Sequence, residues 1–316
     1  MSLDEKTRKQ TGSPIGFALL VAFLSLGAIG GCGSSGTDND LVGSDGSGDP
    51  VPVAPLPATV RGYFASDFTA SQPPALFAGD QYNIWICFRG TTSLMPALIE
   101  DCPRYKTNPP PSGALIFADI GGGEKNSINR ENLLGLSEGR DSEMLVDNGF
   151  SGVVFDLESV GPDFDGYEDF ESTMILAIQA LREQGLYSIL TTSKDGISTG
   201  ALRGKWPKSK STGDDWNVTF PKFQANVVPL FDAYSPQCYS TGTETTPPIC
   251  QSYLGISYDG YSGARAIWPA VSGAWITLKI AEDPIGLLTA MQDDNKTSPS
   301  ALFPTAPTGY LVWAGQ

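Results

Sequence analysis

Short runs of β-branched and aromatic residues recur along most of the chain, and stretches with helical spacing of apolar residues separate several of them. Regular alternation of strands and helices is typical of a parallel α/β fold. Because strands stand at both ends of this region, the pattern predicts a (β/α)8 TIM barrel, with an open doubly wound sheet as the alternative. We expect the strands at Val60–Ala65, Tyr82–Phe88, Gly113–Ile120, Gly152–Leu157, Tyr187–Thr192, Ala233–Tyr239, Trp275–Ile280 and Gly309–Trp313.

Helical periodicity is clearest after the fourth expected strand. Met174, Ile178 and Leu181 would share one face of a helix there, and Gly185 follows as a typical C-terminal stop signal. We expect helices at Arg130–Asn148, Tyr167–Gln184, Phe220–Phe231 and Pro284–Asp293.

The beginning of the chain has a different pattern. A polar segment with basic residues precedes the apolar run Ile15–Ile29, which is shorter than the roughly 20 residues that a bilayer span needs. Small residues then lead to Cys32, and the whole segment resembles a bacterial lipoprotein signal. We therefore expect a signal peptide at 1–31, a disordered tether rich in Gly, Ser, Asp and Pro at 32–58, and one folded domain at 59–316.

The resemblance implies that Cys32 is the lipidated first residue of the mature protein. Gly33, rather than Asp, follows it, and this favours delivery to the outer membrane. The expected location is thus the bacterial cell envelope, lipid-anchored and facing the periplasm or the cell surface. An ordinary signal peptide or a weak anchor helix is the alternative interpretation of the same segment.

Charge and composition narrow the chemistry. The formal net charge of −15 argues against a nucleic-acid partner. The chain contains no histidine, which excludes Ser-His-Asp catalysis and His-ligated metals, so carboxylates, tyrosines or a bound ion must carry any reaction. We expect no cofactor and no metal site, and we expect a monomer.

Four cysteines besides Cys32 form an even set, which in an exported protein indicates disulfides. They can pair in three ways. We favour the local pairs Cys87–Cys102 and Cys238–Cys250. No C-x-x-C spacing is present, so a structural zinc site is not expected.

The β-branched and aromatic run at residues 150–158 ends in two acids spaced two residues apart, Asp156 and Glu158. Side chains two residues apart on a strand project to the same side. If this strand is parallel and buried, contact with water alone cannot explain why two carboxylates lie at its C-terminal end. Glycoside-cleaving barrels place their acidic groups at such strand ends.

Four segments, in chain order, resemble the signature strands of family 18 glycoside hydrolases, the chitinase family. Residues 151–158, S-G-V-V-F-D-L-E, resemble its fourth-strand pattern D-G-x-D-x-D-x-E. D-I-G-G from Asp119 resembles its third-strand S-x-G-G, and Q-C-Y from Gln237 resembles the Q-x-Y of class III chitinases and endo-β-N-acetylglucosaminidases. The segment 309–313 resembles the eighth strand, which ends in tryptophan.

The resemblance implies a role for each matching residue. Glu158 corresponds to the general acid, and Asp156 to the carboxylate that orients the substrate's own 2-acetamido group as nucleophile. Tyr239 corresponds to the phenol that binds the acetamido oxygen, with Gln237 as a polar partner, and Trp313 to the floor under the −1 sugar. The expected substrate is an oligo- or polysaccharide containing β-linked N-acetylglucosamine, cleaved with retained configuration.

Departures from the family pattern keep an alternative open. Val154 and Ser151 replace two of its acids, while Asp119 stands where the family has Ser and is expected to face the substrate site and to supply the missing carboxylate. Tyr63 is a further candidate for the sugar groove. The alternative is a non-catalytic, chitinase-like carbohydrate-binding lipoprotein, and an envelope lipoprotein that binds no sugar is a third reading.

Overall fold

The computed structural model describes residues 54–66, 81–88, 102, 110–122, 128–158, 160, 163–192, 222–223, 225–239, 242–245, 265–278, 285 and 307–313. The predicted signal peptide and lipidation site lie outside these ranges and stay predictions. Across the described ranges, no helix has both the length and the apolar character that crossing a membrane requires.

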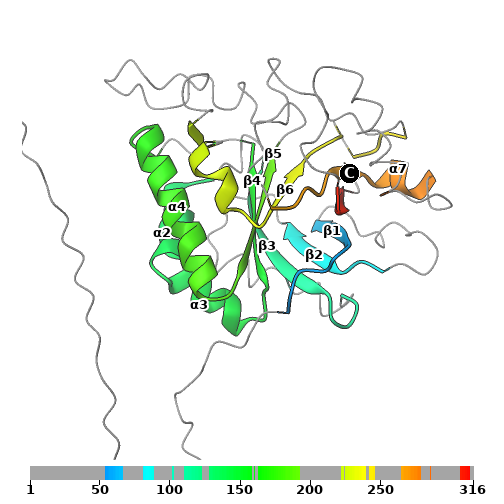
Figure 1. Ribbon diagram of the computed structural model, residues 1–316, viewed down its shortest axis with the longest axis horizontal. Helices are drawn as coiled ribbons and strands as arrows, with labels where there is room; N and C mark the ends of the chain where they lie inside the picture. The colour runs from blue at the N-terminus through cyan, green and yellow to red at the C-terminus, as the bar shows by residue number, and fades with distance from the viewer. Residues whose placement is uncertain are drawn as a thin grey trace, which may run out of the picture. The chain divides into compact units, whose positions relative to one another are not determined.

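Eight parallel strands form a nearly closed barrel with helices between them, so the (β/α)8 prediction is confirmed (Figure 1). The strands follow the order β6-β5-β4-β3-β2-β1-β8-β7, in which the first and last strands of the chain are neighbours. Their bounds are β1 Val60–Ser66, β2 Ile84–Phe88, β3 Leu115–Gly122, β4 Gly152–Leu157, β5 Tyr187–Thr192, β6 Ala233–Pro236, β7 Ala270–Ser272 and β8 Gly309–Trp313.

Isolated bridges join the two strands at the ends of this order. Tyr234 pairs with Ile267 and Gln237 pairs with Ala270, and the Cys238 amide donates to the Ala270 carbonyl oxygen at 2.7 Å. The seam between β6 and β7 is therefore hydrogen-bonded, and the open doubly wound sheet is not the fold of this chain.

Alternation along each strand divides the core into an inner and an outer layer. The inner layer fills the barrel with apolar side chains, among them Phe64, Ile86, Phe117, Val154, Ile189 and Leu311. The outer layer packs the opposite faces of the strands against helices and loops. Every second residue of a strand faces into the barrel, and we say that these residues have the inner parity. Any side chain of inner parity near a strand's carboxyl end therefore points towards the same mouth of the barrel.

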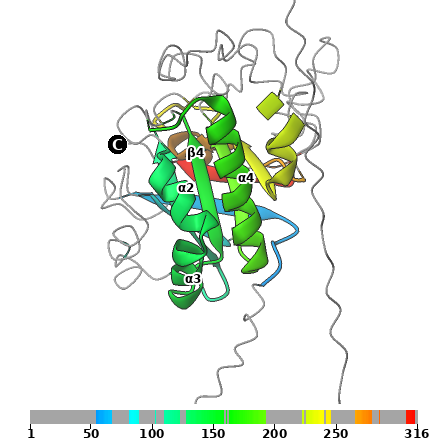
Figure 2. The same cartoon turned by 90° about the vertical axis from the view of Figure 1, so that its left-hand side faces the viewer.

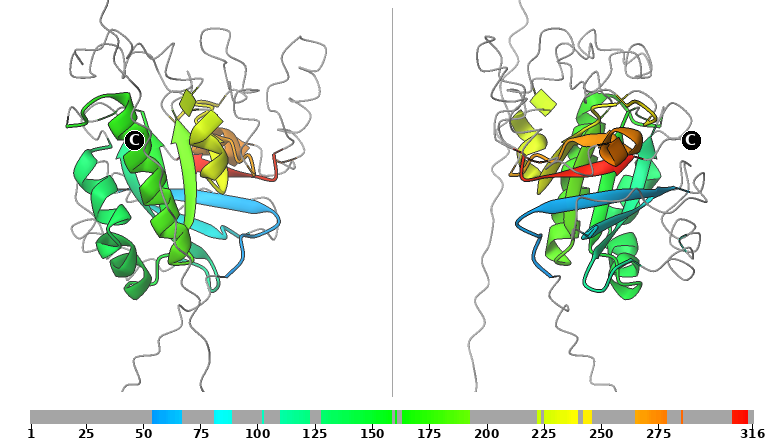
Figure 3. Two further views of the ribbon diagram at one scale, coloured as in Figure 1. Left: turned by 60° about the vertical axis from the view of Figure 1, so that its left-hand side comes forward. Right: turned by 90° about the vertical axis from the view of Figure 1, so that its right-hand side faces the viewer.

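The described helices are α2 Arg130–Ser137, α3 Arg140–Asp147, α4 Tyr167–Glu183 and the short α7 Gly273–Leu278, with a 3-10 turn η2 at Val228–Leu230. In Figure 2, α2 and α4 lie side by side over β4, as their packing contacts also show. Both views of Figure 3 place these helices on the side of the barrel that contains β3, β4 and β5.

Two sequence expectations are wrong in this region. The helix expected at 130–148 is two helices, because Gly139 takes a φ of 85° between them and ends the regular ladder. The strand expected at Trp275–Ile280 is wrong as well, since β7 ends at Ser272 and Trp275 lies in α7. Trp275 and Ile276 are buried in the outer layer, and a short buried helix and a buried strand have the same apolar signature.

Two further expected helices are described only in part. Residues 222–223 and 225–226 are helical, but the segment then continues as η2, where Pro229 interrupts an α-helical ladder. Of the helix expected at 284–293, only Ile285 lies within the described residues, and it is helical.

Candidate active site

Four polar side chains at the barrel mouth come from β3, from β4 and from the end of β6, which β5 separates from β4. Asp119 lies on β3, Asp156 on β4, Glu158 directly after β4, and Gln237 directly after β6. All four stand on the inner parity of their strands. Asp119, Asp156 and Gln237 are less than 8% exposed, and Glu158 is half-buried. The structure therefore brings the predicted acids together at one end of the barrel.

Gly121 allows β3 and β4 to approach one another beside these acids. It pairs in register with Asp156 and has a φ of 109°, which L side chains rarely adopt. A Cβ atom added at Gly121 would collide with the backbone carbonyl oxygen of Asp156. Gly121 is thus a requirement of the strand pairing that positions Asp156.

The amide of Gln237 bridges the two acids of β4. Its Nε2 donates to Asp156 Oδ1 at 3.2 Å and to Glu158 Oε1 at 2.8 Å. The backbone of Gln237 is fixed in turn, because its N–H donates to the Thr192 carbonyl oxygen at 2.9 Å. One rigidly held donor therefore sets the separation and orientation of both carboxyl groups.

Burial raises the pKa of all three acids above their ordinary values. For Asp119 and Asp156 desolvation is the largest cause, and the charge of Glu158 adds to it. For Glu158 desolvation also comes first, while the hydrogen bond from Gln237 acts in the opposite direction. The cluster therefore favours keeping protons, as a group that must protonate a leaving oxygen requires.

Tyr239 and Trp313 form an aromatic pair at the same mouth. Their rings are stacked, with centroids 6.3 Å apart and an interplanar angle of 8°. Burial is the largest cause of the strongly raised pKa of Tyr239, and the charges of Asp156 and Glu158 follow. The phenol therefore remains a hydrogen-bond donor at neutral pH, beside the acids of β4.

Phe88 is the third aromatic residue of this group. The sequence indicated only weakly that it belongs to the site. Its ring lies edge-on to Trp313 with centroids 4.7 Å apart, and Phe64 lies edge-on to Trp313 at 5.8 Å. Phe88 ends β2, so its place on the inner parity follows once the strand register is known. A single aromatic residue at a strand end gives no such indication in the sequence.

Glu244 is a site residue that sequence reasoning missed entirely. Its charge contributes to the raised pKa of Tyr239, and its Oε2 accepts a hydrogen bond from the Gly242 amide at 2.8 Å. The Ser272 hydroxyl lies 2.8 Å from the carbonyl oxygens of both Gly242 and Glu244, which ties this loop to β7. Nothing in the local sequence indicates that contact.

The structure does not bring Tyr63 to the site. Tyr63 is 3% exposed and lies in the outer layer, with its ring centroid 5.5 Å from those of Tyr82 and Trp85. Its neighbour Phe64 faces into the barrel instead. The side-chain alternation of β1 therefore excludes Tyr63 from the groove in which we expected it.

One of the two predicted disulfides lies within the described residues. Cys87 and Cys102 are bonded, with Cα atoms 6.2 Å apart, so that pairing is confirmed. Cys238 also takes part in a disulfide. Its predicted partner, Cys250, lies outside the described residues, so that pairing stays a prediction.

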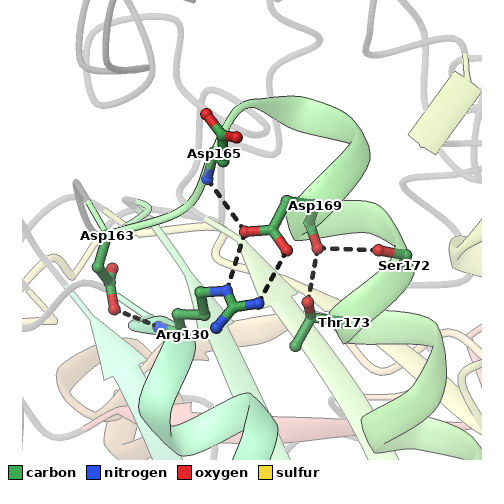
Figure 4. A network of polar contacts seen from close by, with 6 residues as sticks. All are labelled: Arg130, Asp163, Asp165, Asp169, Ser172 and Thr173. Atoms are coloured by element: carbon green, nitrogen blue, oxygen red, sulfur yellow. Dashed lines mark hydrogen bonds and ion pairs between the residues drawn. The ribbon is translucent and has the colours of Figure 1, made fainter.

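The acidic segment that follows β4 stabilises the helices (Figure 4). Arg130 forms a two-point ion pair with Asp169, at 2.9 Å and 3.2 Å, and its backbone N–H donates to Asp163. The Asp165 amide donates to Asp169, and these contacts connect the first turns of α2 and α4. Among the described residues, no cluster of three or more acidic or cysteine side chains is arranged to hold a metal ion.

No family model matches the chain, and no curated protein matches it. Among solved structures it is similar to a family GH18 chitinase from Chromobacterium violaceum, at 14% identity over 83% of this chain and 80% of that chain, with a TM-score of 0.44. A GH18 chitinase from Pseudoalteromonas aurantia is similar at 12% identity over 81% and 93% of the two chains, with a TM-score of 0.39. The spore cortex-lytic enzyme SleL of Bacillus megaterium is similar at 11% identity over 82% and 72%, with a TM-score of 0.36.

The fold and the site together define a (β/α)8 barrel with a buried acidic centre and an aromatic platform at one mouth. At the identities and TM-scores above, the chemistry of this chain has to be argued from its own residues.

Proposed function

We propose that the protein is a retaining glycoside hydrolase that cleaves β-linked glycans containing N-acetylglucosamine, of the chitin or chitooligosaccharide type. The observation that carries this proposal is the Gln237 amide, which holds Asp156 and Glu158 at one point of the barrel mouth. Tyr239 and Trp313 add a phenol donor and an aromatic face there. These groups are the ones that substrate-assisted hydrolysis requires, and the resemblance of the motifs to family 18 supports the same roles.

Glu158 is the proposed general acid. Its pKa is raised by burial, so its carboxyl can remain protonated until a glycosidic oxygen arrives. It is also the most exposed of the three acids, which suits a group that must reach the scissile bond. Glu158 transfers its proton to the leaving oxygen as the bond from that oxygen to the anomeric carbon breaks.

The substrate supplies the nucleophile in the proposed first step. The oxygen of its 2-acetamido group forms a bond to the anomeric carbon, giving a positively charged five-membered ring. Asp156 stabilises that charge and orients the acetamido nitrogen, while the Tyr239 phenol donates to the acetamido group. Water then attacks the anomeric carbon from the side that the leaving group vacated, while the bond between that carbon and the acetamido oxygen breaks and the neutral acetamido group is restored. Glu158 accepts a proton from the attacking water, and the configuration is retained.

Turnover of a fluorogenic chitobioside tests the proposal. We expect Glu158→Gln to lower kcat by about 10²- to 10⁴-fold, because the amide cannot donate the required proton. Glu183→Gln, an exposed glutamate at the end of α4, is the matched control and should hydrolyse the substrate like the wild type. Equal rates for Glu158→Gln and the wild type would contradict the assignment of the acid.

Product stereochemistry gives an independent test. Proton NMR of the first product should show the β-anomer before mutarotation. Inversion, or equal cleavage of a glycoside without an acetamido group, would exclude the proposed mechanism. Binding of chitooligosaccharides with no turnover would instead favour the carbohydrate-binding alternative, which Val154 at an acidic position of the family pattern supports.

We also propose that Cys32 carries a lipid that anchors the protein in the bacterial cell envelope. The apolar run and the small residues before Cys32 support this proposal, together with the polar segment that follows. Such a segment would act as a tether between the membrane and the barrel.

A further inference from the structure

Asp119 is a buried carboxyl that the proposed reaction steps leave unused. Its side chain is 3% exposed, and its Oδ2 atom has no hydrogen-bond partner within the described part of the chain. The residue opposite it on β4 is Val154, which offers no polar group at that level. Gln237, the donor that serves Asp156 and Glu158, makes no hydrogen bond to Asp119 in the structure.

A buried carboxylate oxygen without a donor, such as Oδ2 of Asp119, makes the charged form energetically unfavourable, so a carboxyl in this position holds its proton instead. The groups whose charges raise the pKa values in this cluster, which includes the Tyr239 phenol, are Asp119, Asp156, Glu158 and Glu244. Each of them is acidic. Within the described residues, no basic group contributes to the pKa shifts of these acids. Their mutual repulsion is therefore reduced by binding protons rather than by a neighbouring positive charge.

Asp156 is the acceptor that the strand register places nearest to Asp119. Asp119 pairs with Val154, and Asp156 lies two residues further along β4 on the same inner parity. The two carboxyls are therefore diagonal neighbours on adjacent strands. A proton on Asp119 can be shared with Asp156 directly or through one intervening water.

We propose that Asp119 and Asp156 hold one proton between them, and that Asp119 is thereby a positioning residue that keeps Asp156 aimed at the acetamido group of the substrate. Asp156 would then accept from Gln237 on the β6 side and from the protonated Asp119 on the β3 side. The proton stays within the pair during turnover, and no bond is made to Asp119. The positioning role rests on the proposed function, whereas the shared proton does not.

The shared proton is tested without any substrate, by thermal unfolding of the wild type and Asp119→Asn across pH. Because the folded-state pKa of Asp119 is raised, the folded chain binds more protons than the unfolded chain once the pH passes 3.8. The wild type should therefore lose stability from that pH upward, and the variant should lose less. We expect the Tm of Asp119→Asn, measured relative to that of the wild type, to rise by about 3–5 °C between pH 4 and pH 8.

Ser235→Ala is the matched control for this measurement. Ser235 lies on the inner parity of β6, is fully buried, and has an Oγ with no hydrogen-bond partner among the described residues, but it cannot titrate in this range. The difference in Tm between Ser235→Ala and the wild type should be independent of pH. Asp119→Ser, which is smaller and also uncharged, repeats the test if the Asn variant does not fold. A difference between Asp119→Asn and the wild type that does not change with pH would overturn the proposal.

The positioning role is tested by kinetics on the same chitobioside. Asp119→Asn still donates a hydrogen bond and should keep most of kcat, while Asp119→Ala should lose about 10- to 100-fold in kcat with little change in KM. The alkaline limb of kcat/KM should be less steep in Asp119→Asn, because one titrating group is gone. Equal kcat for Asp119→Ala and the wild type would overturn the positioning role. If the wild type has no turnover, the proposed function fails and the unfolding experiment alone decides whether the proton is shared.

Discussion

At the scale of single residues, Gln237 turns two neighbouring acids into a site with unequal members. Asp156 is almost fully buried and receives the longer hydrogen bond, whereas Glu158 is half-buried and receives the shorter one. The two carboxyls therefore differ in solvation although they are two residues apart. Such a difference suits one group to donate a proton and the other to stabilise charge.

Removal of the Gln237 amide should change the pH dependence of catalysis. The hydrogen bond from Gln237 lowers the pKa of Glu158, so Gln237→Ala should raise that pKa further and move the alkaline limb of kcat/KM to higher pH. We also expect kcat to fall by about 10- to 100-fold, because two carboxyls lose a shared donor. A pH–rate profile measures both effects, with Gln179→Ala on the exposed face of α4 as control. An alkaline limb that stays in place, or moves to lower pH, would contradict the role of this amide.

At the scale of elements, the pairing of β3 with β4 decides whether the acids meet. Asp119, Gly121 and Asp156 belong to one register, and the glycine permits the close approach of the two backbones. The periodicity of apolar residues was misleading at two places. It predicted one helix where α2 and α3 are separate, and it predicted a strand at Trp275–Ile280 although β7 ends at Ser272. The helix break depends on the backbone conformation of Gly139, and the end of β7 depends on how distant segments bury Trp275. The pattern of apolar residues along the chain indicates neither of these.

Gly121→Ala should therefore destabilise the barrel at this seam. The added Cβ meets the Asp156 carbonyl oxygen, and the φ of 109° is unfavourable for alanine, so we expect a loss of about 2–4 kcal/mol in the free energy of unfolding. Gly149→Ala is the matched control, since its φ is 76° but nothing lies within 4 Å of the added atom. It should lose about 1 kcal/mol. Urea unfolding measures both, and equal losses would show that the close approach of β3 and β4 contributes nothing.

At the scale of the whole molecule, an anchored barrel is the arrangement that we expect. Cells that express the full chain and are fed an alkyne-tagged fatty acid should incorporate the tag into the wild type but not into Cys32→Ser. Ser35→Ala, in the same segment, should be labelled like the wild type because it leaves the acylated thiol in place. Labelling of Cys32→Ser would exclude lipidation at this residue.

The sequence by itself determined the parallel α/β alternation, the eight-stranded closure, the local disulfide Cys87–Cys102 and the acidic end of β4. The alternation, the disulfide and the acidic strand end are local, because they depend on strand period and on short separations along the chain. The closure pairs β1 with β8 from the two ends of the folded region, and it could be predicted from the number of strands alone. Only the tertiary structure decided that Tyr63 faces outward, that Gln237 bridges Asp156 and Glu158, and that Glu244 acts on Tyr239. These contacts depend on strand register and on which wall of the barrel each side chain faces, and residues far apart in the chain fix both.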